Sequence, residues 1–272
     1  MGKIVGAFAM SHVLGAPFGR EEQAERVFAG MVEIGRRLRA SAPDVLVVIT
    51  SDHLNNFSLA RLQPFAIGVA AEFTPYGDMG LPLTPFAGNP AFARGFARHA
   101  GQEVAEIENL RPDHGVMIPL GIVDAGHRIA AVPLYVNTVY DPAPTPAESW
   151  RLGEALRQFV ERWRPAGERV AVLAGGGLSH WLGVPQEGQV NEAWDRDFVA
   201  RLISGRGSEL AAFDNADTLA EAGNGGLEVN AWIAMAGAVA GATGECIFYE
   251  AIPAWASGMA GVAMNPDDRA AA

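Results

Sequence analysis

Cysteine is nearly missing from this sequence, which contains only Cys246. A single cysteine excludes an intrachain disulfide and any metal cluster held by several cysteines. A metal site would therefore use histidine nitrogens and carboxylate oxygens. Because a chain without disulfides suits a reducing compartment, we expect a cytoplasmic protein.

Basic residues and long apolar runs are also scarce. The 20 Lys and Arg are outnumbered by 31 Asp and Glu, and the formal net charge is -11. Nucleic-acid binders need a clustered basic face, and the sequence has none. The longest apolar stretch, residues 232–242, is much shorter than the roughly 20 residues of a membrane span. We expect neither a nucleic-acid partner nor a membrane anchor.

Short apolar runs alternate with segments of helical spacing along the 272 residues. Strands are predicted over residues 3–9, 45–50, 65–71, 129–136 and 170–174, and helices over 21–40, 90–99 and 147–163. This pattern predicts a single α/β domain over residues 1–266, with a central mixed or mostly parallel sheet flanked by helices and the active site at the sheet edge. Residues 267–272 are predicted to be a flexible tail. The Pro- and Gly-dense segment 73–90 is predicted to form a rim or lid over that edge.

Three histidines, His12, His53 and His180, each come shortly after one of the predicted strands. The carboxyl ends of parallel strands meet at one sheet edge, where open α/β proteins build their sites. Either His12 or His53 alone would fit a hydrogen-bonded core histidine at least as well, but together they support a shared site. His99 and His127 are assigned to the solvated surface.

Glu228 is the only charged residue between Glu221 and Glu245, and it opens a predicted helix, 228–242, that is apolar nearly all round. Such a helix is buried, and a buried carboxylate needs a cation. The alternative is an acidic residue that stabilises a helix N-terminus through the macrodipole. Asp52 has two open interpretations as well, since it could orient an imidazole or cap its own loop.

Two imidazoles and one carboxylate are the ligand set of non-haem Fe(II) enzymes that bind substrate and O2. A zinc or manganese hydrolase could use the same set. Two further histidines, His114 and His180, lie in glycine-flanked segments and could transfer protons, which favours oxygen chemistry. Ser179 is disfavoured as a nucleophile because Trp181 replaces the second glycine of a nucleophile elbow. A non-catalytic scaffold is also disfavoured, because it needs no buried carboxylate near histidines.

Six segments carry a family resemblance. They are Ser11-His12, Ser51-Asp52-His53, Asp113-His114-Gly115 with Pro119-Leu120, Gly176-Gly177-Leu178-Ser179-His180, Gly226-Leu227-Glu228 with Trp232, and Phe248-Tyr249 with Ile252-Pro253. In these segments and in their order, over almost the whole chain, the sequence resembles the extradiol ring-cleaving dioxygenases of the protocatechuate 4,5-dioxygenase and 2,3-dihydroxyphenylpropionate dioxygenase superfamily.

The resemblance implies an Fe(II) ion held by His12, His53 and Glu228. It implies that His180 is the acid/base residue, which accepts a phenolic proton and later returns it. His114 would line the substrate and oxygen side of the pocket as a hydrogen-bond donor or second proton carrier.

The implied substrates are O2 and a catecholic aromatic of the protocatechuate, gallate or dihydroxyphenyl-acid type, with ring opening next to the diol. A 2-aminophenol is the alternative substrate. Asn55, Asn56 and the segment 73–90 are where we expect substrate selectivity. A homo-oligomer is the default expectation, and the resemblance leaves open a separate small accessory subunit.

Overall fold

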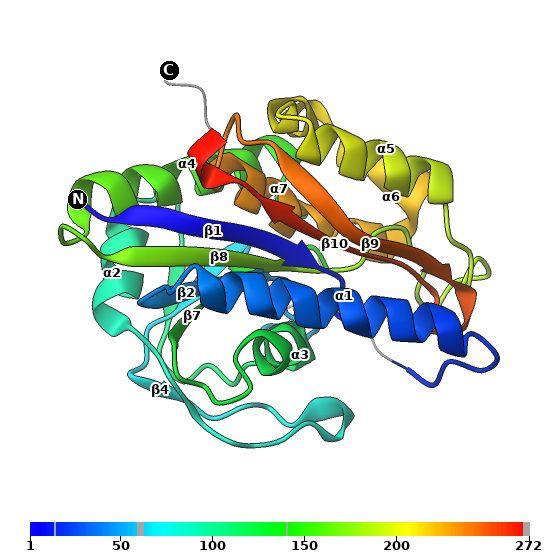
Figure 1. Cartoon of the computed structure of the whole chain (residues 1–272), viewed down its shortest axis with the longest axis horizontal. Coiled ribbons are helices and arrows are strands. Elements are labelled where there is room, and N and C mark those ends of the chain that lie inside the picture. The colour runs from blue at the N-terminus through cyan, green and yellow to red at the C-terminus, as the bar shows by residue number, and fades with distance from the viewer. Residues whose placement is uncertain (14, 59–62, 140, 269–272) are drawn as a thin grey trace.

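An eight-stranded mixed sheet forms the centre of the structure, a computed structural model that describes residues 1–13, 15–58, 63–139 and 141–268 (Figure 1). The strand order is β6-β3-β7-β2-β8-β1-β10-β9. The strands are β1 (Lys3–Met10), β2 (Val45–Thr50), β3 (Phe65–Gly68), β6 (Ala105–Ile107), β7 (Ala130–Val136), β8 (Arg169–Gly175), β9 (Gly244–Ile252) and β10 (Ser257–Met264).

The four central strands, β7, β2, β8 and β1, are parallel. β3 and β10 run antiparallel to their inner neighbours β7 and β1. Every residue of β2 is buried, as its continuous apolar run predicts, because helices cover both faces of the sheet. The predicted mixed, mostly parallel sheet is confirmed, and its central strands all end at one edge.

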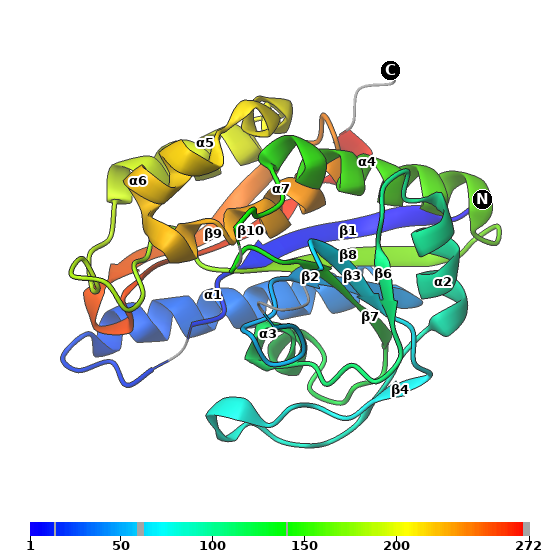
Figure 2. The ribbon, with the colours of Figure 1, turned by 180° about the vertical axis from the view of Figure 1, so that it is seen from behind.

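Helices cover the sheet on both sides (Figure 2). α1 (Glu21–Ala40) and α3 (His114–Val123) pack together on one face. α4 (Pro146–Trp163) and α7 (Val229–Ala238) pack together on the other, with α2 (Pro90–His99) beside α4. α5 (Glu192–Ile203) lies against β9 and β10, next to α6 (Asn215–Gly226). Two apolar cores result, one on each face of the sheet.

Two local differences from the predicted elements concern the site. The segment 73–90 contains a two-stranded ribbon, β4 (Glu72–Phe73) and β5 (Phe86–Ala87), with a short 3-10 helix at Asp78–Gly80. α7 begins directly after Glu228 and ends at Ala238, earlier than predicted. The chain end folds back at Pro266–Asp268, where Asp267 pairs with Lys3, and residues 269–272 of the predicted tail lie outside the described residues.

None of the helices in the described parts of the chain is long and apolar enough to cross a membrane.

The contact between α4 and α7 brings two helix backbones together where a larger residue would not fit. A Cβ atom on Gly153 would lie 1.9 Å from the carbonyl oxygen of Ala234, and one on Gly237 would lie 2.3 Å from the carbonyl oxygen of Trp150. Because α7 starts directly after Glu228, this contact also determines where that carboxylate enters the site.

We expect Gly153→Ala to lower the free energy of unfolding by about 1–3 kcal/mol, because the two backbones must separate to admit the methyl group. Gly121→Ala is the matched control, since Gly121 is an exposed helix position with no atom within 4 Å of the added Cβ. The control should be about 0.5–1 kcal/mol more stable. Urea denaturation measures both, and equal midpoints would contradict the packing argument.

Candidate metal centre and active-site cleft

His12, His53 and His180 follow β1, β2 and β8, which are neighbours in the sheet. The structure therefore brings the three segments to one edge, as the alternation of strands and helices predicts. The rings of His12 and His53 lie 5.2 Å apart, in an edge-to-face arrangement. The other two histidines are apart from this site: His99 is exposed, and His127 is half-buried in a turn beside Phe86.

His114, at the start of α3, completes a cluster of three imidazoles. Its ring centre lies 3.9 Å from that of His53 and 5.4 Å from that of His12. One nitrogen of each ring lies within 4.8 Å of the others, which is close enough to hold a metal ion. By distance alone, His114 competes with Glu228 as the third ligand.

Glu228 points at the same cluster and is only 5% exposed. Its Oε1 lies 3.1 Å from His53 Nε2, and its Oε2 accepts the Gly177 N–H at 2.7 Å and lies 3.8 Å from His12 Nε2. The side chain makes no capping hydrogen bond to the helix that it precedes. The structure thus favours a role at the histidine cluster over the helix-terminus alternative.

The pKa values of this cluster reflect burial and the shared carboxylates. Burial lowers the pKa of His12 to about 3, so that imidazole is neutral. Burial acts in the same direction on His53, but hydrogen bonds to Asp113 and Glu228 outweigh it and raise the pKa of His53 to about 10. Burial would raise the pKa of Glu228, but His12 and His53 hold it well below its usual range. The raised pKa of His53 and the lowered pKa of Glu228 thus depend on each other.

Asp113 orients His53. One oxygen of this buried carboxylate accepts both the backbone N–H of His53 and the ring Nδ1–H, at 2.9 and 3.1 Å, and the other caps α3 at Gly115. Burial would raise the pKa of Asp113, but the His53 hydrogen bond lowers it to about 2. Fixing Nδ1 in this way leaves Nε2 of His53 directed at the cluster.

Asp78 performs the matching role for His114. Its carboxylate accepts the backbone N–H of His114 at 3.0 Å and also bonds its ring Nδ1. Asp78 lies in the 3-10 helix that connects β4 and β5, within the segment predicted to be a rim or lid. This segment therefore contacts the site through the hydrogen bond between Asp78 and His114.

Asp52 caps its own loop, which resolves the two interpretations left open by the sequence. Its carboxylate accepts the N–H groups of Asn55, Asn56 and Phe57. The Asn56 amide bonds Asp52 and the backbone of Arg111, whereas the Asn55 amide donates to Asp113 at 3.1 Å. Both asparagines thus support the loop that carries His53, and their predicted role in substrate binding stays a prediction.

His180 is buried beside the cluster. Its ring Nδ1 lies 2.9 Å from the carbonyl oxygen of Leu178, which selects the tautomer with the proton on Nδ1 and a lone pair on Nε2. A Cβ atom on Gly225 would lie 1.9 Å from that Nε2, so only glycine leaves room for the imidazole. This arrangement gives His180 one free basic nitrogen.

Asp195, on α5, holds the segment that carries His180. It accepts the Ser179 N–H and hydroxyl at 2.8 and 3.0 Å and the Tyr249 hydroxyl at 2.9 Å. Burial raises the pKa of Asp195 to about 6. Ser179 donates to a carboxylate and not to an imidazole, so it lacks the base that a nucleophilic serine needs.

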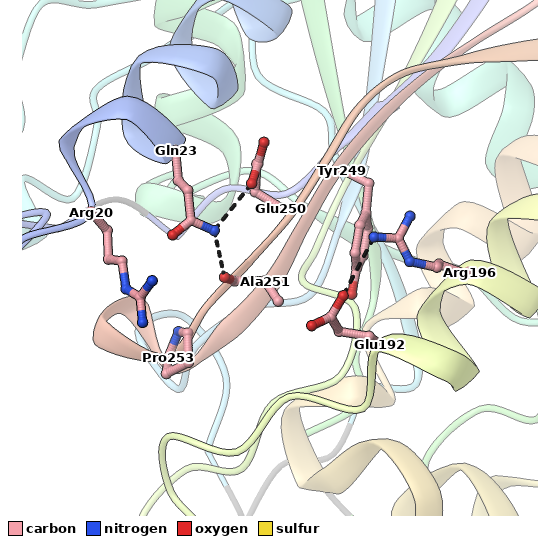
Figure 3. A pocket seen from close by; sticks show the side chains of 8 residues that line it. All are labelled: Arg20, Gln23, Glu192, Arg196, Tyr249, Glu250, Ala251 and Pro253. Atoms are coloured by element: carbon pink, nitrogen blue, oxygen red, sulfur yellow. Dashed lines mark hydrogen bonds and ion pairs between the residues drawn. The ribbon is translucent and has the colours of Figure 1, made fainter.

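Tyr249 also lines a small surface pocket of about 260 Å³, together with Arg20, Gln23 and Arg196 (Figure 3). The Arg196 guanidinium lies over the tyrosine ring, 4.3 Å from its centre. None of the predicted site residues lines this pocket.

A larger cleft of about 810 Å³ opens directly onto the cluster. His53, Glu228 and Gly225 form its inner end. The remaining walls come from the segments after β2, β7 and β8 and from α6: Leu54, Thr138, Val139, Asp141, Pro142, Ala143, Thr145, Leu182, Asp214, Asn215, Ala216, Leu219, Asn224 and Leu227. The cleft gives a small molecule access to His53 and Glu228, whereas His12, His114 and His180 are not among its described lining residues.

The donor set fits a metal ion. His12 Nδ1 is buried and has no hydrogen-bond partner among the described residues, and its other nitrogen faces Glu228. A neutral imidazole, a second imidazole with a carboxylate behind it, and an ionised carboxylate are the usual parts of a His/carboxylate metal site.

Comparison with known proteins agrees with this geometry. Residues 6–260 match the sequence model of a family described as the catalytic LigB subunit of aromatic ring-opening dioxygenase. The chain is 27% identical to a 2,3-dihydroxyphenylpropionate/2,3-dihydroxicinnamic acid 1,2-dioxygenase of Cupriavidus necator, over 90% of this chain and 91% of that one. An enzyme of the same name from Klebsiella pneumoniae is also 27% identical, over 92% and 95% of the two chains.

A solved structure of an uncharacterized protein from Escherichia coli K12 has the same fold, with a TM-score of 0.64, 16% identity, and coverage of 95% of this chain and 99% of that one. At that identity the likeness concerns the fold alone. The family match extends over nearly the whole domain and includes the clustered histidines and Glu228. This chain therefore belongs to the LigB family of aromatic ring-opening dioxygenases.

Proposed function

We propose that the protein is an Fe(II)-dependent extradiol dioxygenase that uses O2 to open the ring of a substituted catechol next to its two hydroxyls. The observation that carries this proposal is the meeting of His12, His53 and Glu228 at the inner end of an open cleft. The names of the two relatives described above support a catechol with a substituent on the ring.

His12, His53 and Glu228 would hold the metal, and His114 would remain beside it. A ferrous ion bound by these residues would supply open coordination positions for the diol and O2 and a route for electron density between them. We assign Glu228 and not His114 as the third ligand because an ionised carboxylate offsets the charge of the metal. When Nδ1 donates to Asp78, Nε2 of His114 presents a lone pair and would accept a hydrogen bond or a proton on the substrate or oxygen side.

His180 would move the proton. Its Nε2 carries the lone pair because Nδ1 is bonded to Leu178, so it can accept a phenolic proton at the start of the reaction. The same nitrogen can return the proton later, when a developing oxygen anion needs one. Asp195 keeps the Ser179–His180 segment in place throughout.

Anaerobic loading of the protein with Fe(II), followed by candidate catechols and then O2, tests the activity. We expect a yellow ring-opened product with matching oxygen uptake. Iron binding without the opening of any catechol or 2-aminophenol would contradict the proposal. Metal analysis of protein purified without added metal distinguishes iron from the zinc or manganese of a hydrolase.

Three alanine variants should separate the roles within the cluster. Glu228→Ala should lose the metal, whereas His114→Ala should retain it. His180→Ala should also retain the metal but lose about 10²–10⁴-fold in kcat, the usual contribution of an acid/base group. Metal content and steady-state rates measure these effects. If His114→Ala lost the metal and Glu228→Ala kept it, the third ligand would be His114.

Asp113→Asn should weaken metal binding by about 10–100-fold, because the ring of His53 loses the carboxylate that orients it. Asp44→Asn is the control, since Asp44 lies at the opposite end of β2 and bonds the backbone of Arg169. Competition with a chromophoric chelator measures both affinities. Equal affinities in the two variants would show that Asp113 does not support the metal site.

A further inference from the structure

Four large aliphatic side chains surround the outer part of the cleft: Leu54, Val139, Leu182 and Leu219. They come from four separate segments, yet each is between 41% and 51% exposed. Apolar side chains that gather in one open cleft beside a reaction centre are typical of a ligand-binding surface. A ligand in the cleft would therefore contact aliphatic side chains on several sides.

The charged groups of the outer cleft are carboxylates. Asp141 and Asp214 line it, and none of its described lining residues is Lys or Arg. The small pocket at Tyr249 differs in that Arg20 and Arg196 line it together with Glu192 and Glu250 (Figure 3). A substituent that ends in a carboxylate would meet apolar walls and like charge in the outer cleft, and it would lose hydration without gaining a partner.

The size of the cleft indicates more than a single ring. Its volume of about 810 Å³ falls in the range of roughly 300–1,000 Å³ that is typical of sites for drug-sized ligands. The reacting diol needs only the inner end, at His53 and Glu228. The outer part remains for a substituent on the ring.

We propose, building on the function proposed above, that the substrate is a catechol whose ring carries a bulky, uncharged, apolar substituent. The diol lies at His53 and Glu228, and the substituent lies against Leu54, Val139, Leu182 and Leu219. This selectivity departs from the acidic substrates named for the two relatives.

A substrate series tests the proposal. 3-Methyl-, 3-propyl- and 3-pentylcatechol should show kcat/KM values that rise about two- to fourfold per added methylene, because each methylene leaves water for the apolar wall. The methyl ester of 3-(2,3-dihydroxyphenyl)propionate should exceed the free acid by at least about tenfold. A free acid that is used as well as its ester, or a flat alkyl series, would overturn the proposal.

Anaerobic binding keeps this inference separate from the proposed function. Calorimetry of the Fe(II)-loaded protein without O2 should rank the same ligands by Kd in the same order. If they bind in that order but no ring opens when O2 is added, the dioxygenase proposal fails and the inferred ligand class stands. If the rings open but the acid binds best, the ligand class fails alone.

Leu219→Lys places a cation in the outer cleft and should shift the ester-to-acid preference toward the acid by about two- to fivefold. Leu182→Lys is the second variant, should the first fold poorly. Val32→Lys, which changes an aliphatic residue that is 60% exposed on α1, is the control and should leave the preference unchanged. If Leu219→Lys leaves the preference unchanged and instead dissociates an oligomer in sedimentation, the patch is a subunit interface and the proposal is overturned.

Discussion

The site depends on the burial of one carboxylate, that of Glu228, among groups that replace its lost water. One oxygen bonds His53 and the other accepts the N–H of Gly177, with His12 close by. An isolated buried carboxylate costs several kcal/mol, so these partners must stay in place for the group to remain ionised. The start of α7, the segment after β8 and the loop after β2 are thereby tied to one point.

Three other carboxylates orient the histidines or the segment that carries them. Asp113 anchors His53, Asp78 anchors His114, and Asp195 anchors the segment that carries His180. The sheet brings the backbone segments to one edge, but it leaves the imidazoles free to rotate. Asp113 and Asp78 remove that freedom for His53 and His114, and the carbonyl of Leu178 removes it for His180.

Much of this arrangement could be predicted from the sequence, because strong local patterns mark it. The continuous apolar runs predict the central parallel strands and place His12, His53 and His180 at their ends. The isolation of Glu228 in an apolar segment marks it as a buried charge. The edge strand β9 is harder to predict, since it is only partly buried and shows no clean alternation.

The orienting carboxylates could not be identified in the same way, because their partners are far away in the sequence. Asp78 lies in a Pro- and Gly-dense segment without periodicity, and its contact with His114 depends on how that segment folds back. Asp195 stands between Trp194 and Arg196 on a helix with many charges, so it looks like a solvated helix position although it is fully buried. Such side chains become recognisable only when the tertiary contacts are known.

Because Asp78 lies outside the eight-stranded sheet, its contact with His114 can be lost under milder conditions than those that unfold the domain. The ribbon that carries Asp78 is a two-stranded sheet distinct from the eight-stranded one. Small peripheral units of this kind can open locally at a lower free energy than the whole domain. Opening of the segment between its two strands can release the ring of His114 while Phe73 and Phe86 keep the ribbon packed in the core, so the loss of turnover on warming need not coincide with the loss of secondary structure.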